Sequence, residues 1–272
     1  MVAKLSLAGK CVPKCNLGTS QSRIPLIRDV RDTMVQLKYF GDSRDFFKYD
    51  LITAVFKHSS LRHYVFVPML TEHRDDNEGN KTPINRGDKS DDLLKFIIRC
   101  NTKSLRHWEG WLNRHVDSYR TVEPVDETFF SDQKRDVYWK AFRTIIGQKN
   151  ALIFVDPDTG LETGKPSYLR RMGREKYILT DELKFLINKI HHSSVLMLYQ
   201  HLPNDKRMHK ESVEKKLEQV RCADCNAYTC AYREDDLAFL FVSREKALIK
   251  EIIGLLTNYH VASDHKYKSL HS

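Results

Sequence analysis

The sequence predicts an α/β protein: a mostly parallel sheet with helices on both faces and a late antiparallel pair of strands. Apolar runs such as Ala151–Val155 contain no polar break, which is typical of strands buried on both faces of a sheet. These runs alternate with segments of helical periodicity, as in folds whose helices connect parallel strands. Near the end of the chain, only residues 233–236 join two apolar runs, and so short a connection permits only an antiparallel pair.

Size and composition are those of a globular protein with one large domain or two small ones. The 272 residues are 41% hydrophobic and 30% charged. No apolar run approaches the roughly 20 residues that span a bilayer, and the first residues are too polar for a secretory signal. We therefore expect a cytoplasmic protein with no membrane association, whose six cysteines stay reduced.

The net charge of +9 indicates an anionic partner, of which nucleic acid, DNA or RNA, is the commonest. Basic residues gather at Arg170-Arg171 with Arg174, and again at Lys206-Arg207 and Lys215-Lys216. Many basic proteins bind no nucleic acid, so the charge alone is a weak indication. The oligomeric state is not predicted by the sequence.

The chain is predicted to have three parts. Residues 1–36 have weak periodicity and are expected to form a peripheral arm. Residues 37–260 are expected to form a single α/β domain, and residues 261–272 a polar, flexible tail.

The first half of the domain is predicted to contain one strand and four helices. The first helix covers 43–58 and is capped by Asp42 or Ser43. The strand 63–67 ends at Pro68, because proline cannot continue a central ladder. A carboxylate-rich loop follows this strand. The other helices are expected over 88–100, 105–119 and 132–146.

The second half of the domain alternates strands and helices more regularly. After the buried strand 151–155 and a basic loop, the pattern predicts a short strand, a helix, a strand and another helix. An antiparallel strand pair and a last helix complete the domain. The expected ranges are 177–179, 181–191, 194–199, 208–220, 227–232 with 237–242, and 244–259.

The stretch that follows strand 151–155 is the candidate site. Asp156-Pro157-Asp158-Thr159-Gly160 is a tight acidic turn, and ligands of open α/β sheets bind outside the carboxyl ends of the strands. The carboxylates of this turn and of Glu162 therefore lie at the usual position of an active site in such sheets. The alternative is that the segment is an ordinary acidic turn with no function. In a parallel sheet, three other segments should converge on this turn: Asp42–Lys48, Glu72–Gly79 and Gln200-His201.

Several stretches together resemble an uncharacterised bacterial protein family. Its members share a Gly-Asp…Asp…Lys-Tyr opening and an Asp-Pro-Asp-Asn-Gly turn. The resemblance covers the greater part of the chain and implies a common fold, but it implies no particular activity. The stretches are YFGDSRDFFKYDLI at 39–52, YVFVPMLTEHRDDNEGNKT at 64–82, ALIFVDPDTGLE at 151–162, KYILTDEL at 176–183 and VLMLYQH at 195–201.

The layout is similar, more distantly, to RlmJ-type ribosomal RNA adenine methyltransferases and to three-Cys-motif partner proteins. RlmJ-type enzymes open with Gly-Asn-x-x-Asp-x-x-Lys-His, and the segment 41–49 keeps the Gly, Asp and Lys of that motif. Their fourth strand ends in Asp-Pro-Pro-Tyr, where this chain has Asp156-Pro157-Asp158-Thr159. The late antiparallel pair is a feature of their Rossmann-like, class I methyltransferase-type sheet. Their Gly-rich loop after the first strand is reduced here to one glycine, Gly79.

This resemblance implies S-adenosylmethionine as the cofactor and methylation of nucleic acid as the reaction. Asp156 and the Pro157 carbonyl would accept the target amino protons. Tyr168 or Tyr199 would stack the extruded base, because Thr159 replaces the aromatic residue of the motif. Position and resemblance together predict a catalytic set of Asp156, Pro157, Asp158, Glu162 and Lys48. The predicted cofactor-binding set is Asp42, Asp45, Asp76, Gly79, Gln200 and His201.

Two other functions stay open. Carboxylates from several strand ends hold Mg²⁺ in metal-dependent nucleases and phosphoesterases, and Asp156, Asp158 and Asp76 supply such a set. The other alternative is a catalytically inactive nucleic-acid-binding or interaction module on the same scaffold.

Cysteines and tryptophans have simpler interpretations than ligand binding. Cys222 and Cys225 have the spacing of half a zinc site, but zinc needs four ligands, so reduced structural cysteines are expected. Trp108 and Trp111 fit the apolar face of a helix and are expected in the core, not on a base-stacking surface.

Overall fold

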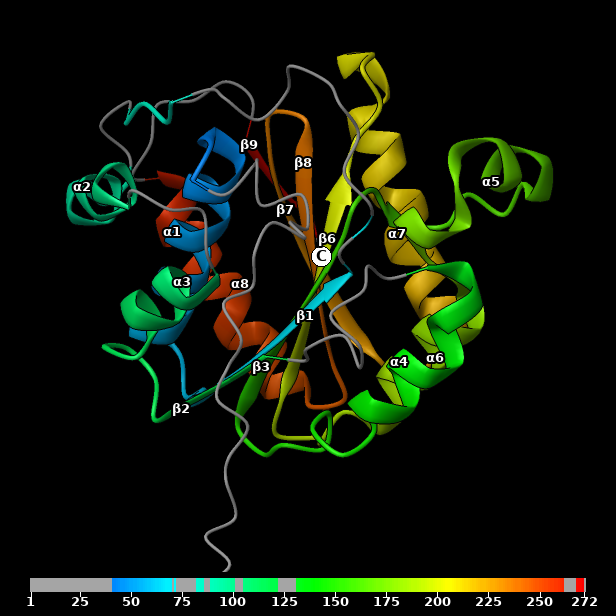
Figure 1. Cartoon of the computed structure of the whole chain (residues 1–272), viewed down its shortest axis with the longest axis horizontal. Helices are drawn as coiled ribbons and strands as arrows, with labels where there is room; N and C mark the ends of the chain where they lie inside the picture. The colour runs from blue at the N-terminus through cyan, green and yellow to red at the C-terminus, as the bar shows by residue number, and fades with distance from the viewer. Residues whose placement is uncertain are drawn as a thin grey trace, which may run out of the picture. The chain divides into compact units, whose positions relative to one another are not determined.

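A sheet of seven strands lies at the centre of the part of the chain that the structure describes (Figure 1). The computed structural model describes residues 41–69, 71, 82–85, 89–100, 105–121, 131–261 and 268–271. The predicted arm, residues 1–36, and the predicted loop segment Glu72–Gly79 lie outside the described residues.

The strands follow one another across the sheet in the order β2 (Ser118–Thr121), β1 (His63–Met69), β3 (Ala151–Pro157), β6 (Val195–His201), β8 (Leu237–Ser243), β7 (Tyr228–Glu234) and β9 (Lys268–His271). β1 is parallel to β2 and to β3, and β3 is parallel to β6. β8 lies antiparallel between β6 and β7, and β9 is antiparallel to β7. The predicted fold class is confirmed: a mostly parallel, Rossmann-like sheet of the class I methyltransferase type with a late antiparallel pair.

Helices cover both faces of this sheet (Figure 1). Along β3, Leu152 and Phe154 enter one apolar core, while Ile153 and Val155 enter the other. Alternate side chains of a strand point to opposite faces, so a strand between two cores has no polar break. The first core is covered by α1 (Ser43–His58), α2 (Asp91–Arg99), α3 (Leu105–Leu112) and α8 (Lys246–Val261), and the second by α4 (Arg135–Phe142), α6 (Thr180–Lys189) and α7 (His209–Ala223).

Helix α1 is buried around most of its circumference. Asp42 caps it and accepts hydrogen bonds from the backbone N–H groups of Arg44 and Asp45 at 2.8 and 2.9 Å. Its buried polar residues have partners, as burial requires. The Asp50 carboxylate, for example, accepts bonds from the Ser90 N–H, at the start of α2, and from the Tyr259 hydroxyl of α8. These contacts fix α1 against its neighbours on the first face.

Strand β1 continues through Pro68 to Met69, so the prediction that it ends at Val67 is wrong. β2 pairs with β1 only as far as Phe66, whereas β3 pairs with it through Met69. The Pro68 carbonyl accepts a hydrogen bond from the Tyr138 hydroxyl at 2.7 Å. Proline is tolerated here because one neighbouring strand has already ended.

Two predicted helices are shorter in the structure. α3 ends at Leu112, and Ser118–Thr121 form β2, where the helical period had predicted a helix to Tyr119. The Tyr119 ring lies 5.3 Å from that of Tyr64 on β1, and such cross-strand packing outweighs a weak helical pattern. The helix expected over 132–146 begins as a 3₁₀ turn, and its α-helical part ends at Phe142.

Besides β2, three further elements were not predicted. They are β4 (Gly160–Leu161), α5 (Pro166–Met172) and β9. β9 lies within residues 261–272, so the predicted flexible tail contains a strand, in which Ser269 pairs with Arg233 of β7. Among the described residues, no helix is long and apolar enough to cross a membrane.

A tight contact joins β4 to β6. The Leu161 N–H donates to the Gln200 side-chain oxygen at 2.9 Å, and a Cβ added at Gly160 would lie 2.5 Å from that side chain. The φ of Gly160 is also +131°, which residues with a side chain rarely adopt. Only glycine therefore fits at this position.

Gly160→Ala should lower the free energy of unfolding by about 2–4 kcal/mol, because backbone strain adds to overpacking against Gln200. Urea unfolding measures the change. Gly147→Ala is the matched control, since a Cβ there meets nothing within 4 Å and its stability should stay near that of the wild type. Equal stability of the two variants would contradict the contact.

Candidate active site

Helix α1 brings Lys48 to the carboxyl end of β3. The Lys48 Nζ lies 2.8 Å from Asp156 Oδ2 and 3.0 Å from Asp45 Oδ1. The three side chains are 10 to 18% exposed, so the contact is nearly closed to water. The predicted convergence of the segment Asp42–Lys48 on Asp156 is thus present in the structure, whereas the roles predicted for these residues stay predictions.

Three carboxyl groups gather near the Lys48 ammonium group. Asp45 accepts further hydrogen bonds from the Gly41 N–H and the Tyr49 hydroxyl, and Asp42 caps the helix beside it. The ammonium group also lies 5.0 Å from the ring centre of Tyr199, which is a favourable cation–π distance. One buried cation is therefore shared by two carboxylates, with a third close by.

The pKa values reflect this excess of negative charge. Burial, and after it the charge of Asp45, raise the pKa of Asp42 to about 6 against the opposing effect of Lys48. Burial likewise raises the pKa of Asp156, although Lys48 opposes the shift. Burial acts to lower the pKa of Lys48, but the charges of Asp156 and Asp45 outweigh it and raise that pKa, so the amine stays protonated. The cluster suits a cationic ligand.

The acidic turn itself is largely occupied by structural contacts. Asp158 forms an ion pair with Lys176 at 3.0 Å. The Glu162 carboxylate accepts hydrogen bonds from the N–H and the hydroxyl of Thr180, at the start of α6. Pro157 is the last residue of β3 and pairs with Met69. Glu162, predicted as catalytic, is thus occupied in holding the start of α6.

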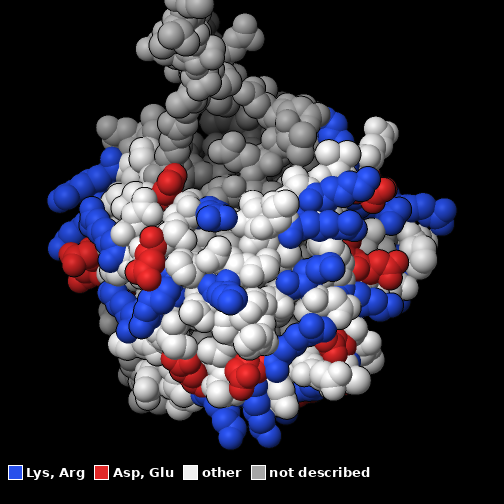
Figure 2. Space-filling model, turned by 90° about the horizontal axis from the view of Figure 1, so that it is seen from below, with Lys and Arg blue, Asp and Glu red and all other residues white. Residues whose placement is uncertain are grey.

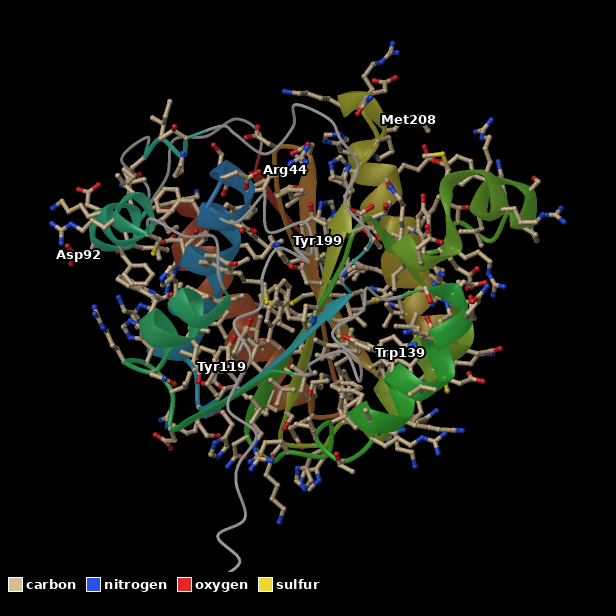
Figure 3. The ribbon with its side chains drawn as sticks, viewed as in Figure 1. Arg44, Asp92, Tyr119, Trp139, Tyr199 and Met208 are labelled. Carbon is tan, nitrogen blue, oxygen red and sulfur yellow. The ribbon has the colours of Figure 1, made fainter. Side chains whose placement is uncertain are left out.

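Gln200 and His201, predicted to bind a cofactor, differ in their surroundings. Gln200 is 4% exposed and holds β4 through Leu161, which is a structural role. The His201 Nε2 lies 3.4 Å from Asp236 Oδ2, and Arg44 pairs with the same carboxylate at 2.6 Å. Figure 3 shows Arg44 and Tyr199 near each other at the same end of the sheet. Arg44 and Asp236 were not predicted, although Arg44 lies inside the opening motif.

The two candidates for a base-stacking ring are unequal. Tyr199 is only 6% exposed, and Lys48 and Phe239 pack against its ring, so it offers little open surface. Tyr168 of α5 is half-buried, and the Arg171 guanidinium lies 5.4 Å from its ring centre. Tyr168 is the more accessible of the two.

The predicted metal set is only partly described. Asp76, like the predicted cofactor residue Gly79, lies outside the described residues. Asp156 and Asp158 are each paired with a lysine, which competes with a metal ion for the carboxylate. No three His, Cys, Asp or Glu residues gather to hold a metal ion in the described part of the chain. Cys222 and Cys225 are exposed free cysteines.

Likeness to known proteins is found among solved structures. No protein-family model and no curated protein matches the chain. Among solved structures, the chain is similar to human methyltransferase-like protein 13, crystallised in complex with SAH. The identity is 10% and the TM-score 0.30, over 78% of this chain and 89% of the other. The fold class therefore rests on the order and direction of the strands, and this likeness adds no argument to it.

Asp42→Asn should remove a pH dependence of stability. Between pH 3.8 and about 6 the unfolded Asp42 carboxyl is ionised while the folded one keeps its proton, so stability falls as the pH rises through this window. Asparagine keeps the capping oxygen. The variant should therefore gain about 2 kcal/mol relative to the wild type between about pH 4 and pH 7.5, measured by urea unfolding. Asp181→Asn, at a 96% exposed side chain, is the control and should show no such gain.

Lys48→Met should destabilise the fold by about 3–5 kcal/mol near pH 8, because it leaves two buried carboxylates without their cation. The loss should be smaller at pH 5 than at pH 8, because burial favours the protonated form of Asp156. Adding Asp156→Asn to Lys48→Met should restore part of the stability, since one unpaired charge is removed. Urea unfolding of both single variants and the double variant tests this cycle. A loss below about 1 kcal/mol at both pH values would contradict the pairing.

Proposed function

We propose that this protein is an S-adenosylmethionine-dependent methyltransferase that acts on nucleic acid. One observation carries the proposal: at the carboxyl end of β3, the carboxylates of Asp45 and Asp156 contact a single buried ammonium group, and the carboxyl group of Asp42 lies close by. Such a site has an excess of negative charge and favours a cationic ligand. It also lies where ligands of open α/β sheets bind.

S-adenosylmethionine fits this charge pattern. It carries a sulfonium and an ammonium group against one carboxylate, so its net charge is positive. Burial raises the pKa of Asp42 to about 6, so a cation bound beside it would stabilise the ionised carboxylate. When bound, the cofactor supplies an electrophilic methyl group. Asp42 and Asp45, at the start of α1, are the residues proposed to hold its positive end.

Asp156 is proposed to orient the nucleophile. Lys48 keeps this carboxylate in place at 2.8 Å, and 18% of the Asp156 side chain remains exposed. An exposed carboxylate oxygen accepts a hydrogen bond from a target amino group and so aims the nitrogen lone pair. The Pro157 carbonyl is proposed as a second acceptor for the same group. The net charge of +9 supports nucleic acid as the substrate.

Calorimetric titration with S-adenosylmethionine should show binding that strengthens up to about fourfold between pH 5.5 and pH 7.5, as Asp42 loses its proton. Asp42→Asn should bind more weakly at pH 7.5 and lose this pH dependence, whereas the exposed control Asp181→Asn should behave as the wild type. S-adenosylhomocysteine, which lacks the sulfonium charge, should depend less on pH.

Transfer of a labelled methyl group to RNA or DNA is the second measurement. Asp156→Ala should abolish transfer, and it should weaken cofactor binding less than Asp42→Asn does, because Asp42 and Asp45 are the residues proposed to hold the cofactor. If the wild type binds no S-adenosylmethionine at either pH, the proposal is wrong.

A further inference from the structure

A short excursion of the chain, residues 158–179, lies between β3 and α6 and is called here the α5 arm. It contains β4, α5, a 3₁₀ turn (Arg174–Lys176) and β5 (Tyr177–Ile178). β4 and β5 form a parallel pair apart from the main sheet. In Figure 1, α5 lies at the outer edge of the molecule, beyond α6 and α7.

The base of the α5 arm is held firmly. The Thr159 carbonyl accepts a bond from the His201 N–H at 2.8 Å, and the Glu162 N–H donates to the Ile178 carbonyl at 3.0 Å. Buried Arg135 of α4 donates to the carbonyls of Arg174 and Tyr177. Because the backbone of the arm is already fixed at these points, the arm loses little conformational entropy when a ligand binds to its outer residues.

A partly buried lysine of α7 holds the other side of the arm. The Lys216 Nζ of α7 lies 2.7 Å from the Leu161 carbonyl oxygen and 2.6 Å from that of Glu162. Leu161 and Ile178 are fully buried, and Leu169 anchors α5 at 5% exposure. The arm is thus a rigid extension of the domain next to the candidate site.

The outer surface of the arm is basic. Lys165, Arg170 and Arg171 are exposed, and the structure gives none of them a carboxylate partner among the described residues. The Arg174 side chain, 44% exposed, has only a 3.4 Å contact with Asp132. Figure 2, the view from below, shows Lys and Arg side chains on the left, lower and right parts of that face, so positive charge is not confined to the arm. Arginine and lysine side chains free of carboxylates are available for phosphate groups.

We propose that the α5 arm binds the phosphate backbone of a single-stranded polynucleotide and presents one of its bases to Asp156. This inference rests on the proposed function and adds the place where the substrate is held. The arm begins two residues after Asp156, and Lys176 neutralises Asp158 at its root. An unpaired strand suits the site, because a base must leave the stack to reach a buried carboxylate. Tyr168, with Arg171 against its ring, adds an aromatic surface beside the cations.

The test compares the full-length wild type with K165Q/R170Q/R171Q. Anisotropy of labelled single-stranded RNA and DNA of about 20 nucleotides measures binding at several salt concentrations. The variant should lose at least about tenfold in affinity, and its slope of log K against log salt should be smaller by about 2, the value for three lost phosphate contacts. The stronger of the RNA and DNA titrations identifies the natural strand.

The matched control, K149Q/K189Q/K250Q, removes the same charge from exposed lysines outside the arm. Its affinity should stay within about twofold of the wild type, with an unchanged salt slope. An equal loss in the control, or no binding of either strand by the wild type, overturns the inference.

Cofactor titration of the same proteins separates the two proposals. The arm variant should bind S-adenosylmethionine as the wild type does. If arm-dependent binding of a strand is found without any cofactor binding, the proposed function fails and the binding surface stands.

Discussion

The ammonium group of Lys48 lies between the carboxylates of Asp45 and Asp156, almost closed to water, and the carboxyl edge of the sheet is built around that contact. A buried charge is tolerated only when it is paired. Helix α1 must therefore place the Lys48 ammonium group within contact distance of Asp156 at the end of β3. The bonds from Asp50 to the start of α2 and to α8 hold the helix in that position. The packing of one face of the sheet and the geometry of the candidate site are therefore set together.

The pairing of the buried Lys48 ammonium group divides the acidic residues near the end of β3 into two groups. Asp42, Asp45 and Asp156 surround the Lys48 cation, so their excess charge is concentrated at one place. Asp158 and Glu162 are satisfied by Lys176 and Thr180, and they stabilise the α5 arm and the start of α6. The carboxylates near the end of β3 thus form one charged site around Lys48 and, beside it, a set of contacts that stabilises the α5 arm and α6.

Much of the fold could be predicted because its signals are local. The unbroken run of β3 predicted a strand between two cores, and the rule for parallel strand ends predicted that Asp42–Lys48 meets Asp156. The role of Gln200 depends on the absence of a side chain at Gly160, a contact between distant strands that no local pattern contains. β2 was missed for a related reason, because its pairing with β1 overrides a helical period around Trp111 and Tyr119.

The charges of the site and of the α5 arm have opposite signs, and the structure keeps them apart. A polynucleotide would be repelled by three clustered carboxyl groups, whereas a cationic cofactor would be attracted to them. Lys165, Arg170 and Arg171 lie on the outer surface of a rigid arm, with the paired Asp158 and Lys176 at its root. With a cation bound beside Asp156 the repulsion falls, so one edge of the sheet can accept two ligands of opposite charge. This separation of charge, more than any single motif, is what the proposed transfer of a group from a cation to a polyanion would require.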